Sequence, residues 1–125
     1  MSTITTTGNE ATLNLISSIG VYKQLTLSSN SSREQIMRVE LDDDRERAME
    51  YRFTGEGTVG RILNLPPTTR KVVLAFSHQA DGKQKPSELK VGGPYLFGSV
   101  QTGIIVAENG DDQDFNDAVA QLLVK

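Results

Sequence analysis

Carboxylates are concentrated in one short stretch near the C-terminus, residues 108–117. Five of them lie within these ten positions, with carboxamides between them: Glu108, Asp111, Asp112, Asp114 and Asp117. Negative charges this close repel one another in a folded protein, and a hard divalent cation with oxygen ligands relieves that repulsion. Calcium fits best, because it accepts oxygen ligands in flexible geometry, whereas zinc prefers nitrogen or sulfur. The sequence therefore predicts a calcium site in this stretch.

An EF-hand loop is the first specific hypothesis, because Asp112, Asp114 and Asn116 match its first, third and fifth ligand positions. The match then fails at two places. The sixth position is Asp117, where the sharp turn needs Gly, and the twelfth is Leu123, where a bidentate Glu is needed. A different calcium loop remains, with a solvated acidic loop that binds no ion as the alternative, since exposed Asp-rich turns are common.

The number of carboxylates indicates two ions rather than one. The carboxylates of Glu108, Asp112, Asp114 and Asp117 would together neutralise two calcium ions. In an extended segment, Asp112 and Asp114 point the same way, and Glu108 and Asp117 converge on that side if the backbone turns at Gly110. The chain has no Cys and one His, which disfavours zinc.

The segments that must position these side chains have the sequence pattern of β-strands. Short apolar stretches that alternate with polar residues and end at Gly, Asn, Asp or Pro predict an all-β fold. We expect one domain, residues 1–125, that forms an antiparallel β-sandwich of about nine strands behind a flexible polar N-terminus at residues 1–10. The strands are predicted at residues 11–17, 21–27, 35–41, 48–53, 57–65, 71–77, 87–91, 100–107 and 118–124. Two continuous apolar runs, residues 72–76 and 104–107, are predicted to be buried on both faces, which suggests two packed sheets.

Composition limits the partners. The formal net charge of −3 and the absence of a basic patch argue against nucleic acid. No apolar run is long enough to insert into a membrane, and no signal peptide is recognisable. We expect a soluble protein, cytoplasmic by sequence, with release or cell-surface association by another route left open.

Three other features are interpreted as structural. His78 is expected at the surface or at a strand end, without a chemical role. The run Asp42-Asp43-Asp44 is expected to be a solvated hairpin tip, and Gly92-Gly93-Pro94 a turn.

Three segments together resemble the LecB-type lectins, small soluble bacterial proteins that bind fucose and mannose through two calcium ions. Their signature, Glu-x-Gly-x-Asp-x-Asp-aromatic-Asn-Asp-Ala-Val, is met by residues 108–119. Asn30-Ser31-Ser32 is similar to the turn that supplies one calcium ligand and the sugar-selecting residues of that family. Residues 53–58 resemble a family segment whose last Thr contacts the sugar. The resemblance covers residues 15 to 125.

The resemblance implies a nine-stranded sandwich in which two neighbouring calcium ions hold one monosaccharide. Glu108 and Asp112 would serve one ion, Asn30 and Asn116 the other, and Asp114 and Asp117 would bridge both. The sugar would meet Ser31, Ser32, Arg33, Thr58, Asn109, Asp112, Asp114 and Asp117. In this family a Ser at the position of Ser31 accompanies a preference for fucose over mannose.

Departures from the family pattern affect assembly and affinity. The family completes the second ion's shell with the C-terminal carboxylate of a partner subunit, a role that would fall here to Lys125. We expect at least a homodimer, also because residues 118–124 are apolar on both faces and would be a liability at a sheet edge. Asn109 stands where the family often has Asp, so a weaker neutral hydrogen bond to the sugar is expected. Arg33 replaces a small residue, and could reach a larger glycan or crowd the site.

We expect a lectin and not an enzyme. Two other functional classes remain as alternatives. A two-metal hydrolase would need an acid or base near the ions, and the sole His lies far away in the sequence. A calcium-clamped adhesive or assembly module would bind the ions and no sugar.

Overall fold

The computed structural model describes residues 2–15, 22–109 and 117–125, with the side chains of residues 55–59 excepted. The described chain forms nine strands and one short 3-10 helix, η1, at Arg45–Arg47. The strands are β1 (Thr3–Thr7), β2 (Glu10–Asn14), β3 (Lys23–Leu41), β4 (Met49–Leu65), β5 (Lys71–Ala80), β6 (Lys83–Pro86), β7 (Glu88–Phe97), β8 (Val100–Glu108) and β9 (Ala118–Val124). The predicted all-β class and antiparallel sandwich are confirmed.

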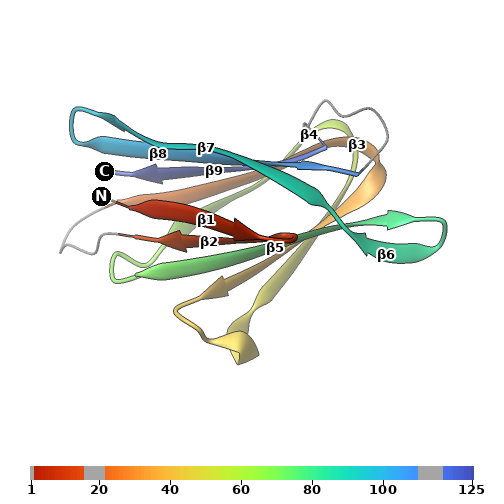
Figure 1. Cartoon of the computed structure of the whole chain (residues 1–125), viewed down its shortest axis with the longest axis horizontal. Coiled ribbons are helices and arrows are strands. Elements are labelled where there is room, and N and C mark those ends of the chain that lie inside the picture. The colour runs from red at the N-terminus through yellow and green to blue at the C-terminus, as the bar shows by residue number, and fades with distance from the viewer. Residues whose placement is uncertain (1, 16–21, 110–116) are drawn as a thin grey trace.

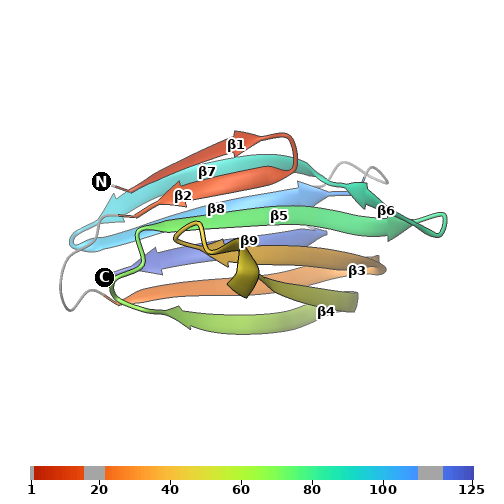
Figure 2. The ribbon, with the colours of Figure 1, turned by 90° about the horizontal axis from the view of Figure 1, so that it is seen from below.

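All nine strands belong to one antiparallel sheet, which folds over on itself into a barrel-like sandwich (Figure 1). The main order is β1-β2-β5-β3-β9-β8-β7, with β4 paired to β3 and β6 paired to β5. Figure 2 shows β3, β4 and β9 lying side by side at one edge of the view, and β1 near β7 at the other. On that second side, β1 lies against β7, and the backbone N–H of Ser2 donates to Oε1 of Gln101 at 2.9 Å.

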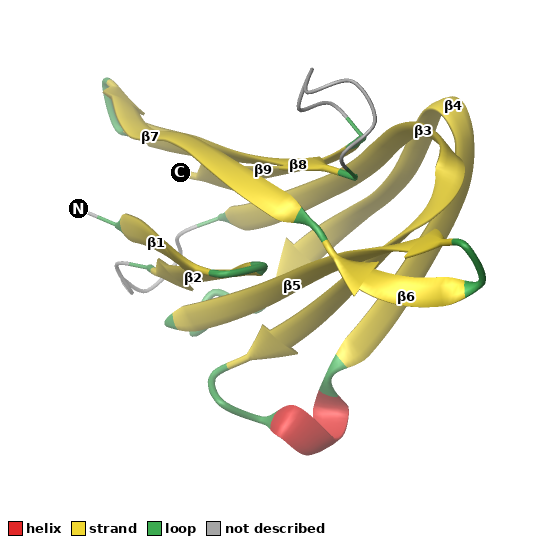
Figure 3. Cartoon of the chain, turned by 45° about the vertical axis from the view of Figure 1, so that its right-hand side comes forward, coloured by secondary structure: helices red, strands yellow, loops and turns green. Residues whose placement is uncertain are grey.

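β3 joins the two layers, because it changes its neighbour halfway along. Its first half, residues 23–29, pairs with β9, and its second half, residues 35–41, pairs with β5. β4 accompanies both halves, with register shifts between Leu27 and Gln35. Figure 3 shows β3 and β4 curving together from one layer into the other. The change of neighbour falls at residues 30–34.

The core forms on the inner face of these strands. Alternate residues of β5 are buried, among them Val72, Leu74 and Phe76, and they pack with Leu25, Leu27 and Met37 of β3 and with residues of β8 and β9. Strict alternation is the pattern of a strand with one buried face. The prediction that residues 72–76 and 104–107 are buried on both faces was therefore wrong, since Val73, Ala75, Ile104 and Val106 are partly exposed.

The strand count agrees with the prediction, but the strands are divided differently. Residues predicted as two strands, 21–27 and 35–41, lie in the single strand β3, and residues 48–53 and 57–65 lie in β4. The polar residues Ser28–Ser32 were interpreted as a turn. The backbone instead bends at bulges and stays extended, and bulges re-aim side chains without ending a strand.

Three further expectations are corrected. The N-terminal segment was expected to be flexible, but Thr3–Thr7 pairs with β2, and Ile4 packs against the core; all five residues of this strand are β-branched, which favours strands. β9 was expected to be a liability if it lay at a sheet edge, but it lies between β3 and β8, so that condition is not met. Gly92-Gly93-Pro94 was expected to be a turn, but it forms an irregularity within β7, where the register with β8 shifts.

Candidate functional site

The acidic motif predicted from the sequence begins and ends at two paired strands. Glu108 is the last residue of β8 and Asp117 directly precedes β9, and these strands are paired up to Ala107 and Ala118. The N–H of Asp117 donates to the carbonyl of Ala107 at 3.1 Å, which continues the pairing by one residue. Glu108 and Asp117 are therefore held at neighbouring positions, and their relative exposures are only 1% and 5%.

Asn109 forms hydrogen bonds with both Asp117 and β3. Its backbone N–H donates to Oδ2 of Asp117 at 2.9 Å. Its side-chain Nδ2 donates to Oγ of Ser31, 78 positions earlier in the sequence, at 3.0 Å. Both residues are buried. Asn109 thus connects the acidic residues to β3 rather than projecting freely into solvent.

The segment of β3 that changes neighbour supplies the other predicted residues. The N–H of Asn30 donates to the carbonyl of Asp117 at 2.9 Å, just beyond the pairing of Ser29 with Ala118. Oγ of Ser31 also accepts the N–H of Arg33 at 3.1 Å. Ser32 is exposed and Arg33 half-buried. The structure therefore places Asn30 next to Asp117 and Ser31 next to Asn109.

Thr58 lies on β4 directly opposite Ser29, so its backbone is next to the same segment. Asp112, Asp114 and Asn116, the centre of the predicted metal loop, lie outside the described residues. Among the residues that are described, no group of three acidic, His or Cys side chains is assembled to hold a metal ion. The structure thus describes the two ends of the acidic motif, residues 108–109 and Asp117, and the neighbouring segment of β3, residues 30–33.

Lys125 lies away from these residues in its own chain. It follows β9, which begins directly after Asp117. Its N–H donates to the carbonyl of Tyr22 at 2.8 Å, and the N–H of Tyr22 donates to the carbonyl of Lys125 at 3.0 Å. Six steps of an extended strand separate Ala118 from Val124, about 20 Å. A contribution of Lys125 to the metal site would therefore have to come from a second copy of the chain.

His78 is placed differently from its prediction. It is buried on β5, and its Nδ1 lies 2.9 Å from Oγ of Ser87, which is also buried. The expectation of a surface position was wrong because His78 continues the inward alternation of Val72, Leu74 and Phe76. That period-two pattern was the signal that could have located it. Its register partner on β3 is Gln35, so the core becomes polar toward the candidate site.

The Asp42-Asp43-Asp44 run is exposed, as predicted, and also has a structural role. Oδ1 of Asp42 accepts the backbone N–H groups of Arg70 at 2.9 Å and Lys71 at 3.0 Å. Nζ of Lys71 contacts Oδ1 of Asp43 at 2.8 Å. This turn therefore fixes the start of β5 from the end of β3.

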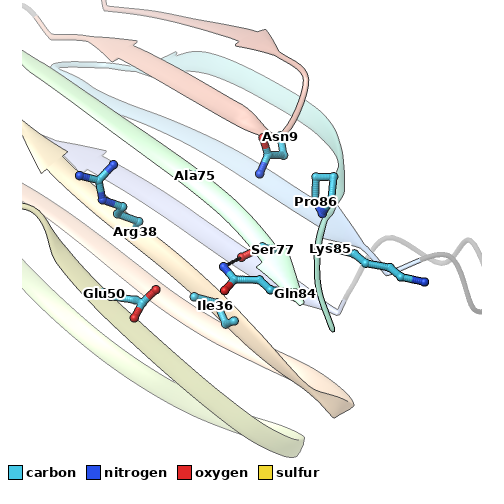
Figure 4. A pocket seen from close by; sticks show the side chains of 9 residues that line it. All are labelled: Asn9, Ile36, Arg38, Glu50, Ala75, Ser77, Gln84, Lys85 and Pro86. Carbon is cyan, nitrogen blue, oxygen red and sulfur yellow. Dashed lines mark hydrogen bonds between the residues drawn. The ribbon is translucent and has the colours of Figure 1, made fainter. Parts of the chain in front are cut away.

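A separate groove lies on the outer face of β3, β4 and β5 (Figure 4). Its lining includes Ile36, Arg38, Glu50 and Ser77, and Nε2 of Gln84 donates to Oγ of Ser77 at 2.7 Å. None of its lining residues belongs to the predicted metal or sugar set. The groove and the candidate site are therefore different places on the molecule.

The donor set of the candidate site suits a hard cation. Glu108 and Asp117 provide buried carboxylates, and Asn30 and Asn109, whose side chains carry amide oxygens, are both hydrogen-bonded to Asp117 through their backbone N–H groups. Oxygen ligands of this kind are those of calcium rather than zinc. Two carboxylates at neighbouring buried positions repel each other, and a divalent cation offsets that repulsion, so the residues fit the ion.

This fold and this oxygen-rich end of the sandwich define an all-β binding domain. Residues 17–125 match the model of the family described as Fucose-binding lectin II (PA-IIL). Because the match covers most of the chain, the chain belongs to this lectin family. Among curated protein sequences, none matches the chain significantly.

Solved structures agree with this membership. The C-terminal domain of the BC2L-C lectin from Burkholderia cenocepacia is 25% identical, with a TM-score of 0.65, over 98% of this chain and 97% of that one. The Chromobacterium violaceum lectin CV2L, solved with alpha-methyl-fucoside, is 22% identical, with a TM-score of 0.62, over 90% of this chain and 93% of that one. A high-affinity mannose-binding lectin of Ralstonia solanacearum is 21% identical, with a TM-score of 0.58, over 86% and 96%. The last two likenesses establish the fold alone.

No helix among the described residues is long and apolar enough to cross a membrane.

Proposed function

We propose that this protein is a calcium-dependent lectin that binds one fucose- or mannose-type monosaccharide at the end of the sandwich where β3 meets the β8–β9 pair. The observation that carries the proposal is the contact of two distant segments. Nδ2 of Asn109 donates to Oγ of Ser31, while Asn30 is hydrogen-bonded to Asp117. The acidic motif and the sugar-selecting segment of the family are thereby neighbours in this chain.

The metal ligands proposed are those of the family pattern. Glu108 and Asp112 serve one ion, Asn30 and Asn116 serve the other, and Asp114 and Asp117 bridge both. When bound, calcium supplies coordination positions at which sugar hydroxyls replace water. Glu108 and Asp117 are buried at neighbouring positions at the ends of β8 and β9, which supports this assignment because a divalent cation offsets the repulsion between adjacent carboxylates.

The proposed sugar-facing residues come from two strands, β3 and β4, and from the acidic motif. Ser31, Ser32 and Arg33 lie on β3, with Ser32 exposed. Thr58 lies on β4, opposite Ser29. We propose that Ser32 hydrogen-bonds the sugar, that Thr58 contacts its methyl group, and that Asn109 acts through Ser31 as described below. The relatives solved with a fucoside and described as mannose-binding support this class of ligand.

Calorimetric titration tests this function. Methyl α-L-fucoside and methyl α-D-mannoside are titrated into the protein in excess calcium and again in excess chelator. We expect saturable binding with one sugar per chain in calcium, no binding in chelator, and recovery when calcium is restored. Binding that survives the chelator would contradict the calcium-dependent site.

Calcium titration, a glycan array and a turnover assay together separate the alternative functions. Calcium binding without binding of either sugar or of any glycan on an array would indicate a structural clamp. Turnover of ester or glycoside substrates that requires the metal would indicate a hydrolase.

A further inference from the structure

The β3 segment at the candidate site leaves the strand ladders. Pairing with β9 ends at Ser29, and pairing with β5 begins at Gln35. On the β4 side, the register pairs only Ser31 between Ser29 and Gln35. Backbone N–H and C=O groups in such a segment need other partners, because unpaired polar groups away from water are costly. Side chains of β3 itself provide part of this pairing.

Two side chains hold the peptide groups of Arg33 from either side. Oγ of Ser31 accepts the N–H of Arg33 at 3.1 Å. Nε2 of Gln35 donates to the carbonyl of Arg33 at 3.2 Å. The residues two positions before and two positions after Arg33 therefore fix its backbone. Ser31 in turn accepts a hydrogen bond from Nδ2 of Asn109, so the hydrogen bonds around Arg33 are connected to the acidic motif.

Gln35 is an unusual residue for its position. Its side chain is completely buried, and its inward-facing neighbours along β3 are Met37 and Val39. Its Oε1 has no hydrogen-bond partner in the described part of the chain. A buried acceptor without a partner destabilises the folded state, and an unbranched apolar side chain there would avoid this cost. The carboxamide is explained by the contact that its Nε2 makes with the carbonyl of Arg33 in this segment.

We propose that Gln35 is a positioning residue of the sugar site. It does not touch the sugar. By donating a hydrogen bond to the carbonyl of Arg33, it sets the orientation in which Ser32 and Arg33 face the ligand. It thereby contributes to the choice between fucose and mannose. This inference rests on the lectin function proposed above.

The substitution Gln35→Met tests the proposal, because Met has a similar length and no donor. We expect the affinity for the preferred sugar to fall about fivefold, the size of one lost hydrogen bond, and the ratio of fucose to mannose affinities to change. The calcium affinity and the melting temperature of the apo protein should be unchanged, or the melting temperature raised. Gln121→Met, at an exposed position of β9, is the matched control and should leave both affinities as in the wild type.

Two outcomes would overturn the proposal. Gln35→Met could bind both sugars as the wild type does, or it could lose calcium affinity, sugar affinity and thermal stability together, which would indicate a general structural role. A wild-type protein that binds no sugar would instead refute the lectin function, which makes the two failures distinguishable.

A measurement on the wild type covers the case in which Gln35→Met does not fold. The side-chain NH₂ protons of Gln35 should exchange with solvent much more slowly than those of exposed Gln121, by NMR on the full chain. Equal exchange rates would show that Gln35 does not hold Arg33 and would overturn the proposal.

Discussion

Nδ2 of Asn109 donates a hydrogen bond to Oγ of Ser31 at 3.0 Å, in a buried contact. Ser31 Oγ also accepts the N–H of Arg33. A serine hydroxyl has two acceptor lone pairs and one donor proton, so both acceptor positions of Ser31 are used. Toward any additional partner, Ser31 can therefore act only as a donor. Asn109, expected from the sequence to form a weaker neutral hydrogen bond to the sugar, also donates to Ser31 in this structure.

The substitution Ser31→Ala should lower the affinity for fucose more than that for mannose. It removes the acceptor of both Arg33 and Asn109, and leaves a buried amide without its partner, a cost of about 1–3 kcal/mol. Ser31→Thr, which keeps the hydroxyl, is the control. Titration of both sugars checks this, and an unchanged affinity ratio in Ser31→Ala would show that Ser31 does not set the preference.

L-fucose should bind more tightly than D-mannose, with mannose still bound. The family pattern supports this, since Ser occupies position 31, and a methyl contact from Thr58 would add about 0.8 kcal/mol if fully buried. That is roughly fourfold, so Arg33 could reverse the order. Competition of both monosaccharides against one labelled glycan measures the ranking. A lower inhibitory concentration for mannose would contradict it.

Asp117→Asn should abolish sugar binding. The amide keeps an acceptor for the N–H of Asn109, so the backbone arrangement is retained while one proposed bridging charge is lost. Asp114→Ala should act in the same way. Asp81→Asn, at an exposed turn with positive φ that Asn tolerates, is the control. Undiminished binding by Asp117→Asn at limiting calcium would rule out the two-ion arrangement.

The protein should associate at least to a homodimer. The apolar character of β9 no longer supports this, because β9 is paired on both sides. The remaining support is family membership together with Lys125, which is at the far end of β9 from its own acidic motif. Sedimentation at micromolar concentration with calcium present tests the expectation, and a monomer would contradict it.

The stability should depend on pH through Lys23. This buried lysine donates from Nζ to the carbonyls of Pro67 at 2.6 Å and Thr69 at 2.7 Å, and burial lowers its pKa below the usual 10.5, opposed by the nearby Asp42 charge. Between the folded pKa and 10.5, the unfolded chain binds more protons, so the free energy of unfolding rises with pH. The gain in the free energy of unfolding that comes from Lys23 is fully present above pH 10.5, and it is lost as the pH falls through the pKa of Lys23 in the folded state.

Urea unfolding of the wild type and of Lys23→Met, measured from neutral to alkaline pH, isolates this effect from other titrating groups. The wild type should gain stability relative to Lys23→Met as the pH rises. A constant difference between the two proteins would contradict the lowered pKa.

The sequence predicted the strands through local alternation, because each strand buries one face and exposes the other. It predicted the candidate metal residues Glu108 and Asp117 through a local motif. It did not predict that β3 continues through Asn30–Ser32, since Ser and Asn favour turns as readily as bulges. The contact between Ser31 and Asn109 joins residues 78 positions apart, and no local pattern specifies such a contact.

The change of neighbour along β3 has a consequence for how this fold can diversify. Residues 32–34 pair with no strand in the registers described for β4, β5 and β9. Substitutions at Ser32 and Arg33 therefore leave the registers of the strand ladders intact, so the part of the chain proposed to choose the sugar can vary without a change in strand pairing. New specificities can therefore accumulate in this segment without rebuilding the sheet, provided that Ser31 and Gln35 continue to hold Arg33 between them.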